Sequence, residues 1–398
     1  MVREIRRKVF DVRRLGKGLL IGLSVILVSA ILAPELLDRY HNRVLNLDIK
    51  RAPVEAKELH GSLTVADLHA DTLLWSRNFL KRVGYGHLDL PRLREGNVAL
   101  QVFSVVTKSP RNRNYESNPS DSDILMPGLV LAGWPPRTWS SLLQRALYQS
   151  ERLKRMVKKS DGDLRLVRNG TDLQLLLASR KETRGLVGAL LAIEGAHCLE
   201  GQIENIDELF NEGYRMVGLA HFFDNEVGGS AHGVDKKGLT EFGRMVVRQL
   251  EKRRMIIDLA HSSPRVYEEV LRMATRPIVV SHGGVKGTCD SVRNLDDNIL
   301  RTIAERGGLI GIGYWDGAIC DPTPSSWARA VEYSIAIMGE DHVALGSDFD
   351  GAVAVGFDTS ELSLLTAELM ALGMKEKTIR KIMGENVVRF LQENLPLN

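Results

Sequence analysis

Cysteine and net charge are both scarce in this 398-residue sequence. Three cysteines, Cys198, Cys289 and Cys320, are too few for a disulfide-built scaffold and leave at least one thiol unpaired; the sequence does not decide whether Cys289 and Cys320 pair. A formal net charge of +3, from 53 basic and 50 acidic side chains, argues against nucleic acid as the main partner. The chain is 44% hydrophobic and has no repeat or low-complexity tract beyond residue 38, which excludes a disordered chain, a collagen-like chain and a polytopic membrane protein.

The charge that is present is concentrated at the N-terminus. Residues 1–17 hold seven basic and two acidic side chains, so this segment carries +5 and the remainder of the chain −2. Residues 18–33 then follow without a single charged side chain. Sixteen helical residues extend about 24 Å, and inclusion of residues 34–37 brings the segment close to the roughly 30 Å core of a bilayer. We therefore expect a basic segment at 1–17 and a transmembrane signal anchor at 18–37.

The same asymmetry predicts an orientation. The positive-inside rule places the N-terminus in the cytoplasm and a catalytic domain, residues 38–398, in the periplasm or outside the cell. A cleaved signal peptide is one alternative, because Ser29, Ala30 and Ala33 supply small side chains, although no A-x-A site follows. A buried core helix is the other alternative, but a helix that is apolar on every face beside such a basic segment is unusual in a soluble domain.

Beyond residue 38, short apolar runs alternate with amphipathic stretches. Continuous apolar runs are typical of parallel strands buried on both faces, and the amphipathic stretches are typical of helices. We expect eight strands, at 64–68, 99–105, 188–193, 216–219, 255–259, 278–280, 309–312 and 343–345. Eight strands separated by helices predict an α/β fold of the (β/α)8 TIM-barrel type. A doubly wound open sheet is the alternative, but no G-x-G-x-x-G follows the first strand.

Residues 107–160 interrupt this alternation. A polar, turn-rich stretch at 109–123 precedes an expected helix at 140–157. An insertion after the second strand, on the mouth side of the barrel, explains the interruption, and such loops often control access of the substrate. A surface excursion without function is the alternative.

Metal-binding residue types follow six of the eight expected strands. They are His69, Asp71, Glu194, His221, His261, His282 and Asp348. Because the C-terminal ends of barrel strands share one rim, we expect these side chains to converge, and buried ionisable groups are costly unless they are paired or bound to metal. Imidazole and carboxylate without thiolate suit Zn²⁺, with Mn²⁺, Co²⁺ or Fe²⁺ as substitutes. The ligands outnumber the four of one tetrahedral ion, so we expect two Zn²⁺ per chain that share a carboxylate and activate a bridging water.

The remaining histidines are expected to lie outside this cluster. His197, three residues after Glu194, is expected to support the site rather than bind metal. The others lie away from strand ends and are expected at the surface: His41, His60, His87, His232 and His342.

From about Val65 to the C-terminus the sequence resembles the membrane dipeptidase family, also called renal dipeptidase or peptidase family M19. The resemblance is carried, in order, by DLHADTLLW, LAIEGAH, YRMVGLAHFFDN, GLTEFGR, MIIDLAHSS, PIVVSHGG, SVRNLDDNIL and ALGSDFDG. It implies a (β/α)8 barrel with a binuclear zinc site that hydrolyses dipeptides, and it suggests a homodimer.

The resemblance also implies a role for each site residue. His69 and Asp71 would hold one zinc, His261 and His282 the other, and Glu194 would bridge them. His221 would contact the substrate near the scissile carbonyl, which suits stabilisation of an oxyanion. Arg293 would bind the substrate carboxylate through its planar guanidinium. Asp348 would take a proton from the bridging water and return it to the leaving amine.

These observations together predict a membrane-anchored, zinc-dependent dipeptidase that attacks the peptide bond with a metal-bridging hydroxide. Another binuclear amidohydrolase, acting on a cyclic amide, a lactam or a base to be deaminated, is the alternative, since fold and metal do not determine the substrate. Such enzymes commonly bridge their ions with a carboxylated lysine, so Glu194 at the bridging position favours the dipeptidase. A non-catalytic binding module would require the loss of a ligand, and none is lost.

Overall fold

The computed structural model describes residues 32–397. Within this range, no helix has both the length and the apolar character needed to cross a membrane. The basic segment predicted at 1–17 and most of the anchor predicted at 18–37 lie outside the described residues. Residues 32–41, which begin the described chain, are helical.

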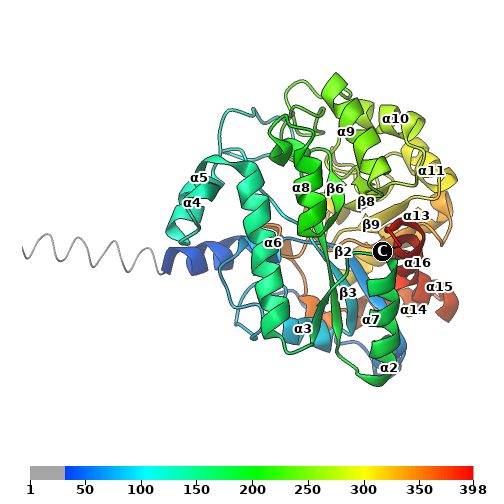
Figure 1. Ribbon diagram of the computed structural model, residues 1–398. Coiled ribbons are helices and arrows are strands. Elements are labelled where there is room, and N and C mark those ends of the chain that lie inside the picture. The colour runs from blue at the N-terminus through cyan, green and yellow to red at the C-terminus, as the bar shows by residue number, and fades with distance from the viewer. Residues whose placement is uncertain (1–31, 398) are drawn as a thin grey trace, which may run out of the picture.

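Eight parallel strands close into a barrel, as the sequence predicts (Figure 1). They are β2 (Val65–Ala70), β3 (Val98–Phe103), β5 (Val187–Ile193), β6 (Tyr214–Gly218), β7 (Ile256–Asp258), β8 (Val279–Gly283), β9 (Leu309–Ile312) and β10 (Val343–Leu345). Each strand pairs with the next, β10 pairs with β2, and β3 pairs directly with β5 through the register Leu100↔Gly188. One further strand, β4 (Leu164–Leu166), pairs with the first half of β5 outside this ring. All eight predicted runs overlap observed barrel strands.

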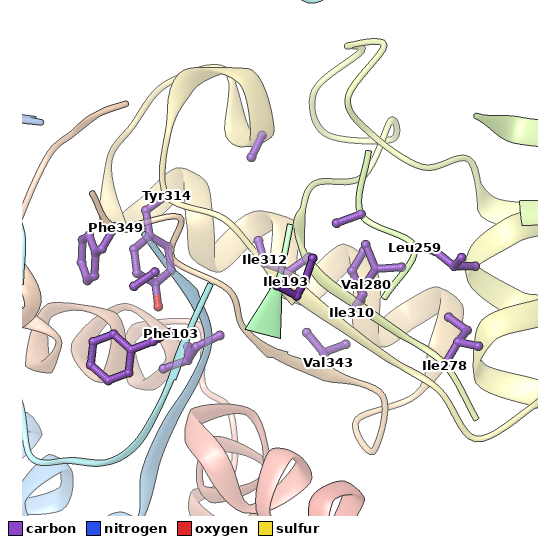
Figure 2. Packing of buried hydrophobic residues seen from close by; sticks show 14 of the residues in the cluster. Phe103, Ile193, Leu259, Ile278, Val280, Ile310, Ile312, Tyr314, Val343 and Phe349 are labelled. Atoms are coloured by element: carbon purple, nitrogen blue, oxygen red, sulfur yellow. The ribbon is translucent and has the colours of Figure 1, made fainter. Parts of the chain in front are cut away.

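The strands are buried on both faces, which explains their continuous apolar composition. Alternate residues along them belong to two different buried clusters, as a side-chain period of two requires. One cluster contains Ile256, Val279, Leu309 and Ala344, and the other contains Ile257, Val280, Ile310 and Val343. Figure 2 shows the second cluster at close range, where Val280, Ile310 and Ile312 pack beside one another.

Helices surround the barrel, and several of them are amphipathic. They include α7 (Gly170–Glu182), α8 (Asn205–Glu212), α9 (Glu241–Lys252), α10 (Pro264–Met273), α11 (Asp297–Glu305), α13 (Pro324–Met338) and α16 (Asn386–Asn394). In α9 the buried residues Gly243, Val246, Val247 and Leu250 recur at helical spacing and form one apolar stripe. The helix begins where the Thr240 side chain accepts a hydrogen bond from the Gly243 amide, which satisfies an otherwise unpaired N–H of the first turn.

The predicted insertion forms a helical unit of its own. After β3 the chain folds into α4 (Leu125–Leu131), α5 (Arg137–Ser140) and α6 (Leu142–Lys159) before it enters β4. In Figure 1 these helices lie on the same side of the barrel as the helix at residues 32–41. The helix predicted at 140–157 corresponds to α6.

Three of the histidines expected at the surface are buried, so that prediction is wrong for them. His60 bonds through Nδ1 to the Thr366 hydroxyl at 2.9 Å and through Nε2 to the Gly96 carbonyl at 3.0 Å. His87 accepts a hydrogen bond from the Asp350 amide at 2.9 Å, and His232 Nδ1 lies 2.7 Å from the Tyr115 carbonyl. A single polar partner is enough to bury a neutral imidazole, and position relative to strand ends carries no information about such partners.

Cys289 and Cys320 form a disulfide across 31 residues, and Cys198 is buried and unpaired. Cys289 lies in the loop after β8, and Cys320 directly follows α12 (Asp316–Ile319). The Asn294 side-chain amide donates to the carbonyls of Cys289 and Ala318, both at 2.8 Å. The disulfide and these bonds tie together two loops beyond the C-terminal ends of β8 and β9.

Candidate active site

The seven predicted metal-competent residues meet at the C-terminal end of the barrel. His69 and His282 lie in β2 and β8, and Asp71 and Glu194 directly follow β2 and β5. His221, His261 and Asp348 each lie three residues after the end of a strand. A cavity of about 650 Å³ opens above them and is lined by Asp71, Glu194, His221, His261 and Asp348, while His69 and His282 lie beneath its surface.

Glu194 lies at the centre of the cluster. Its Oε1 lies 2.9 Å from Nε2 of His261, 3.4 Å from Nε2 of His282 and 3.6 Å from Nε2 of His69. Its Oε2 lies 3.5 Å from Nε2 of His221. One carboxylate thus faces four imidazole rings through its two oxygens, which is the arrangement a bridging ligand requires.

Two carboxylates complete the other side of the cluster. Asp71 Oδ2 lies 3.5 Å and Asp348 Oδ1 lies 3.9 Å from Nε2 of His69. Three overlapping groups of potential ligand atoms result, and together they include all seven predicted residues: His69, Glu194 and His282; Glu194, His221 and His261; and His69, Asp71 and Asp348. The groups share Glu194 and His69, so the cluster is continuous.

Several atoms in the cluster lack hydrogen-bond partners that would explain their burial. Among residues 32–397, His69 Nε2 and Asp71 Oδ1 are buried without any such partner. His261 Nε2 and His282 Nε2 face each other at 3.0 Å. Buried polar atoms are normally paired, and neutral imidazole nitrogens and carboxylate oxygens directed at one point are ligands of a divalent cation such as Zn²⁺. The residues present therefore fit a metal centre.

Ser281 determines which ring nitrogens can face the centre. Its hydroxyl lies 2.5 Å from Asp258 Oδ2, 2.9 Å from His282 Nδ1 and 3.2 Å from His69 Nδ1. Asp258 can only accept, so the single hydroxyl proton goes to Asp258, and the serine oxygen accepts from both imidazoles. Both rings therefore carry a proton on Nδ1, which leaves Nε2 as the nitrogen that can bind a metal.

Asp67 joins β2 to the loop that carries Asp348. Its carboxylate accepts from the His69 amide at 3.0 Å, from the Ser347 amide at 3.0 Å and from the Ser347 hydroxyl at 2.9 Å.

Asp348 and His261 both have left-handed backbones, with φ of 56° and 62°. Residues other than glycine rarely adopt this conformation, and it recurs where surrounding structure holds a functional side chain in place.

The cluster concentrates buried carboxylates, and this raises the pKa values of Asp348, Glu194 and His69. Burial raises the pKa of Asp348 to about 7, with the Asp71 carboxylate adding to the rise and His69 opposing it. Burial and Asp71 also raise the pKa of Glu194 well above its usual range. Burial alone would lower the pKa of His69, but the carboxylates of Asp71 and Glu194 outweigh it and raise that pKa to about 10. These raised pKa values reflect the buried negative charge of the carboxylates, which a divalent cation would compensate.

Arg293 lies beside the cluster and lines the same cavity. Its side chain is buried and donates to the His282 carbonyl at 3.0 Å, and its guanidinium lies 5.7 Å from the centre of the Trp315 ring. Among residues 32–397 it forms no salt bridge, so its remaining N–H groups are free to bind an anion in the cavity. Arg293 lies in the loop between β8 and α11, and the Cys289–Cys320 disulfide holds this loop.

Other cavity residues were not expected from the sequence. Ser109, Arg113, Tyr115 and Leu129 of the insertion line the cavity, which favours the interpretation that the insertion shapes access to the site. Ser281 and Asp258 were missed as well, although both lie within motifs that carry the family resemblance. His197, expected to support the site, bonds through Nε2 to the Thr107 hydroxyl at 3.0 Å and lies outside the three ligand groups.

Several known proteins similar to this chain are dipeptidases. The family model described as membrane dipeptidase (peptidase family M19) matches residues 54–395. Dipeptidase aclJ of Aspergillus oryzae is 26% identical over 400 residues, covering 95% of this chain and 88% of that protein. The crystal structure of the metallopeptidase dipeptidase AC is 26% identical with a TM-score of 0.72, covering 84% of this chain and 99% of that chain. A metallopeptidase from Rhodobacter sphaeroides, liganded with a phosphinate mimic of the dipeptide L-Ala-D-Ala, is 25% identical with a TM-score of 0.68, covering 83% and 99%.

The geometry around Ser281 predicts that its hydroxyl contributes to metal affinity. Ser281→Ala removes the group that orients both His69 and His282, so we expect Zn²⁺ to bind about 10- to 100-fold more weakly. Competition against a chromogenic chelator measures this affinity directly. Ser334→Ala is the matched control, because that buried hydroxyl donates to the Ala330 carbonyl within α13. Unchanged zinc affinity in Ser281→Ala would contradict the assignment.

Proposed function

Because the chain belongs to the membrane dipeptidase family (peptidase family M19) and is a metallo-dipeptidase, we propose that it hydrolyses dipeptides at two Zn²⁺ ions held at the C-terminal end of the barrel. The observation that carries this proposal is the buried cluster around Glu194, in which four imidazoles face one carboxylate. His69 and Asp71 would hold one ion, His261 and His282 the other, and Glu194 would bridge them. When bound, such a pair supplies Lewis acidity and a water of lowered pKa.

Asp348 is the proposed proton carrier. It lines the cavity with Glu194, and its Oδ1 lies 3.9 Å from Nε2 of His69. A carboxylate in this position can accept a proton from the attacking water and return it to the leaving amine.

His221 and Arg293 would bind the substrate. Burial lowers the pKa of His221 well below its usual range, and its Nε2, 3.5 Å from Glu194 Oε2, would contact the substrate near the scissile carbonyl. Arg293, on the same cavity, offers N–H groups to the C-terminal carboxylate of a dipeptide. A short substrate spanning the two would place its peptide bond above Glu194.

The cellular location is proposed from two further observations. The +5 segment followed by the uncharged run at residues 18–33 supports a signal anchor that ends before Pro34 and Leu37, which line the cavity, with the catalytic domain in the periplasm or outside the cell. The Cys289–Cys320 disulfide supports the same location, since disulfides form and persist in oxidising compartments.

Metal removal is the direct test of the catalytic proposal. Exhaustive chelation should lower dipeptide hydrolysis by at least about 100-fold, because the water loses its activating charge, and added Zn²⁺ should restore it. Metal content is measured by mass spectrometry on the same samples, and circular dichroism reports whether the fold persists. Full activity in protein shown to be metal-free would contradict the proposal.

Arg293→Ala tests recognition of the carboxylate. We expect KM for free dipeptides to rise about 10- to 100-fold, the range of a charge-assisted hydrogen bond, while KM for C-terminally amidated dipeptides changes little. Arg301→Ala is the matched control, since Arg301 is an exposed arginine paired with Asp297 on α11. Equal effects on free and amidated substrates would refute the role of Arg293.

The anchor is tested by extraction. The full chain should remain in the membrane fraction after an alkaline carbonate wash, whereas Leu23→Arg combined with Leu27→Arg should release it, because each central arginine costs about 3 kcal/mol of insertion. Protease added to intact cells or spheroplasts should degrade the catalytic domain. Recovery of a chain that lacks residues 1–33 would show a cleaved signal peptide instead.

A further inference from the structure

We propose that residues 32–45, which precede the part of the chain matched by the family, form one wall of the substrate cavity and hold the loop that carries Asp348. On this proposal Leu37 and Tyr40 help to select the substrate side chain, and Asp38 is a positioning residue. The family model matches residues 54–395, so this wall lies outside the part of the chain that the model describes. The inference rests on the proposed function only in taking the cavity as the dipeptide site.

The helix at residues 32–41 faces the active-site cavity directly. Pro34, Leu37, Tyr40 and His41 line the same cavity as the catalytic cluster. Leu37 is 41% and Tyr40 is 71% exposed, so both side chains are available to contact a bound molecule. Residues of the insertion, from Ile124 to Ala132, line the cavity as well, and Figure 1 shows this helix close to α4.

A buried ion triad fixes this helix to the catalytic loop. Arg77 Nη1 lies 2.6 Å from Asp38 Oδ2, and Arg77 Nη2 also pairs with Asp350, two residues after Asp348. All three side chains are almost completely buried. Asp350 in turn accepts from the Thr72 hydroxyl at 2.6 Å. Because the single Arg77 guanidinium donates to both carboxylates, it bridges the helix at residues 32–41 and the loop that carries Asp348.

A second set of bonds continues along the same two segments. The Asn42 side chain donates to Asp38 Oδ1 at 2.8 Å and accepts from the Ala352 amide at 3.0 Å. Next, β1 (Arg43–Val44) pairs in parallel with β11 (Ala354–Val355). Residues 38–44 thus lie alongside residues 350–355, and a displacement of one segment displaces the other.

This wall lies where it can contact the side chain of a bound dipeptide and so discriminate among substrates. The metal cluster, His221 and Arg293 would bind the groups that every dipeptide shares, which are the peptide bond and the terminal carboxylate. Discrimination among dipeptides must then come from other parts of the cavity wall. Leu37 and Tyr40 line the cavity together with apolar residues such as Leu125 and Leu129, which suits a substrate with a large apolar side chain.

The test uses the full chain and a panel of dipeptides from Gly-Gly to dipeptides with a large apolar side chain at either end. Leu37→Ala and Tyr40→Ala should lower kcat/KM about 10-fold for one set of apolar dipeptides, with less than a 2-fold change for Gly-Gly. Leu36→Ala is the matched control, since Leu36 is 61% exposed on the same helix and does not line the cavity. Uniform changes across the panel, or none, would overturn the wall assignment while dipeptidase activity stands.

Asp38→Asn tests the positioning role. We expect kcat to fall about 10-fold for every dipeptide, Gly-Gly included, and Asp38→Glu to recover part of it. Glu35→Gln is the control, because Glu35 pairs with Arg39 at the surface of the same helix. A lowered melting temperature with unchanged kcat at 25 °C would show a purely structural role and overturn the positioning assignment. A wild-type chain without dipeptide hydrolysis would overturn the proposed function instead.

Discussion

Compensation of buried negative charge is the constraint on which this structure depends. Glu194, Asp71 and Asp348 are buried within a few ångströms of one another, and their repulsion together with burial raises the pKa of Glu194 and Asp348. Divalent cations remove this cost, and the surrounding imidazoles hold such cations without adding charge. The hydrogen bonds of Ser281, Asp258 and Asp67 keep the ligands in the tautomer and orientation that such cations require.

Much of the barrel could be predicted from the sequence, for a physical reason. Parallel strands buried on both faces must be apolar throughout, so runs such as 188–193 and 309–312 are visible without alignment, and the rim residues follow from where these runs end. The seven-residue cluster was accessible by the same argument, since strand ends in a barrel share one face. The family resemblance supplied the separate roles, which spacing alone could not distinguish.

What could not be predicted depends on contacts between distant parts of the chain. The burial of His87 and His232 is decided by partners such as the Asp350 amide and the Tyr115 carbonyl, and no local pattern indicates them. The Cys289–Cys320 pair required the spatial approach of two loops. Ser281 is ordinary in sequence, and its importance comes from two rings and a carboxylate that meet at one oxygen.

The helix at residues 32–41 has a consequence for how this enzyme can diverge from its relatives. The barrel and its candidate ligands lie within the residues that the family model matches, whereas part of the cavity wall is supplied by residues before 54. Substitutions at Leu37 and Tyr40 affect neither barrel closure nor the Asp38–Arg77–Asp350 triad. A comparison restricted to residues 54–395 would therefore treat two such enzymes as equivalent even where their cavity walls differed, and a truncation at residue 54 would remove part of that wall.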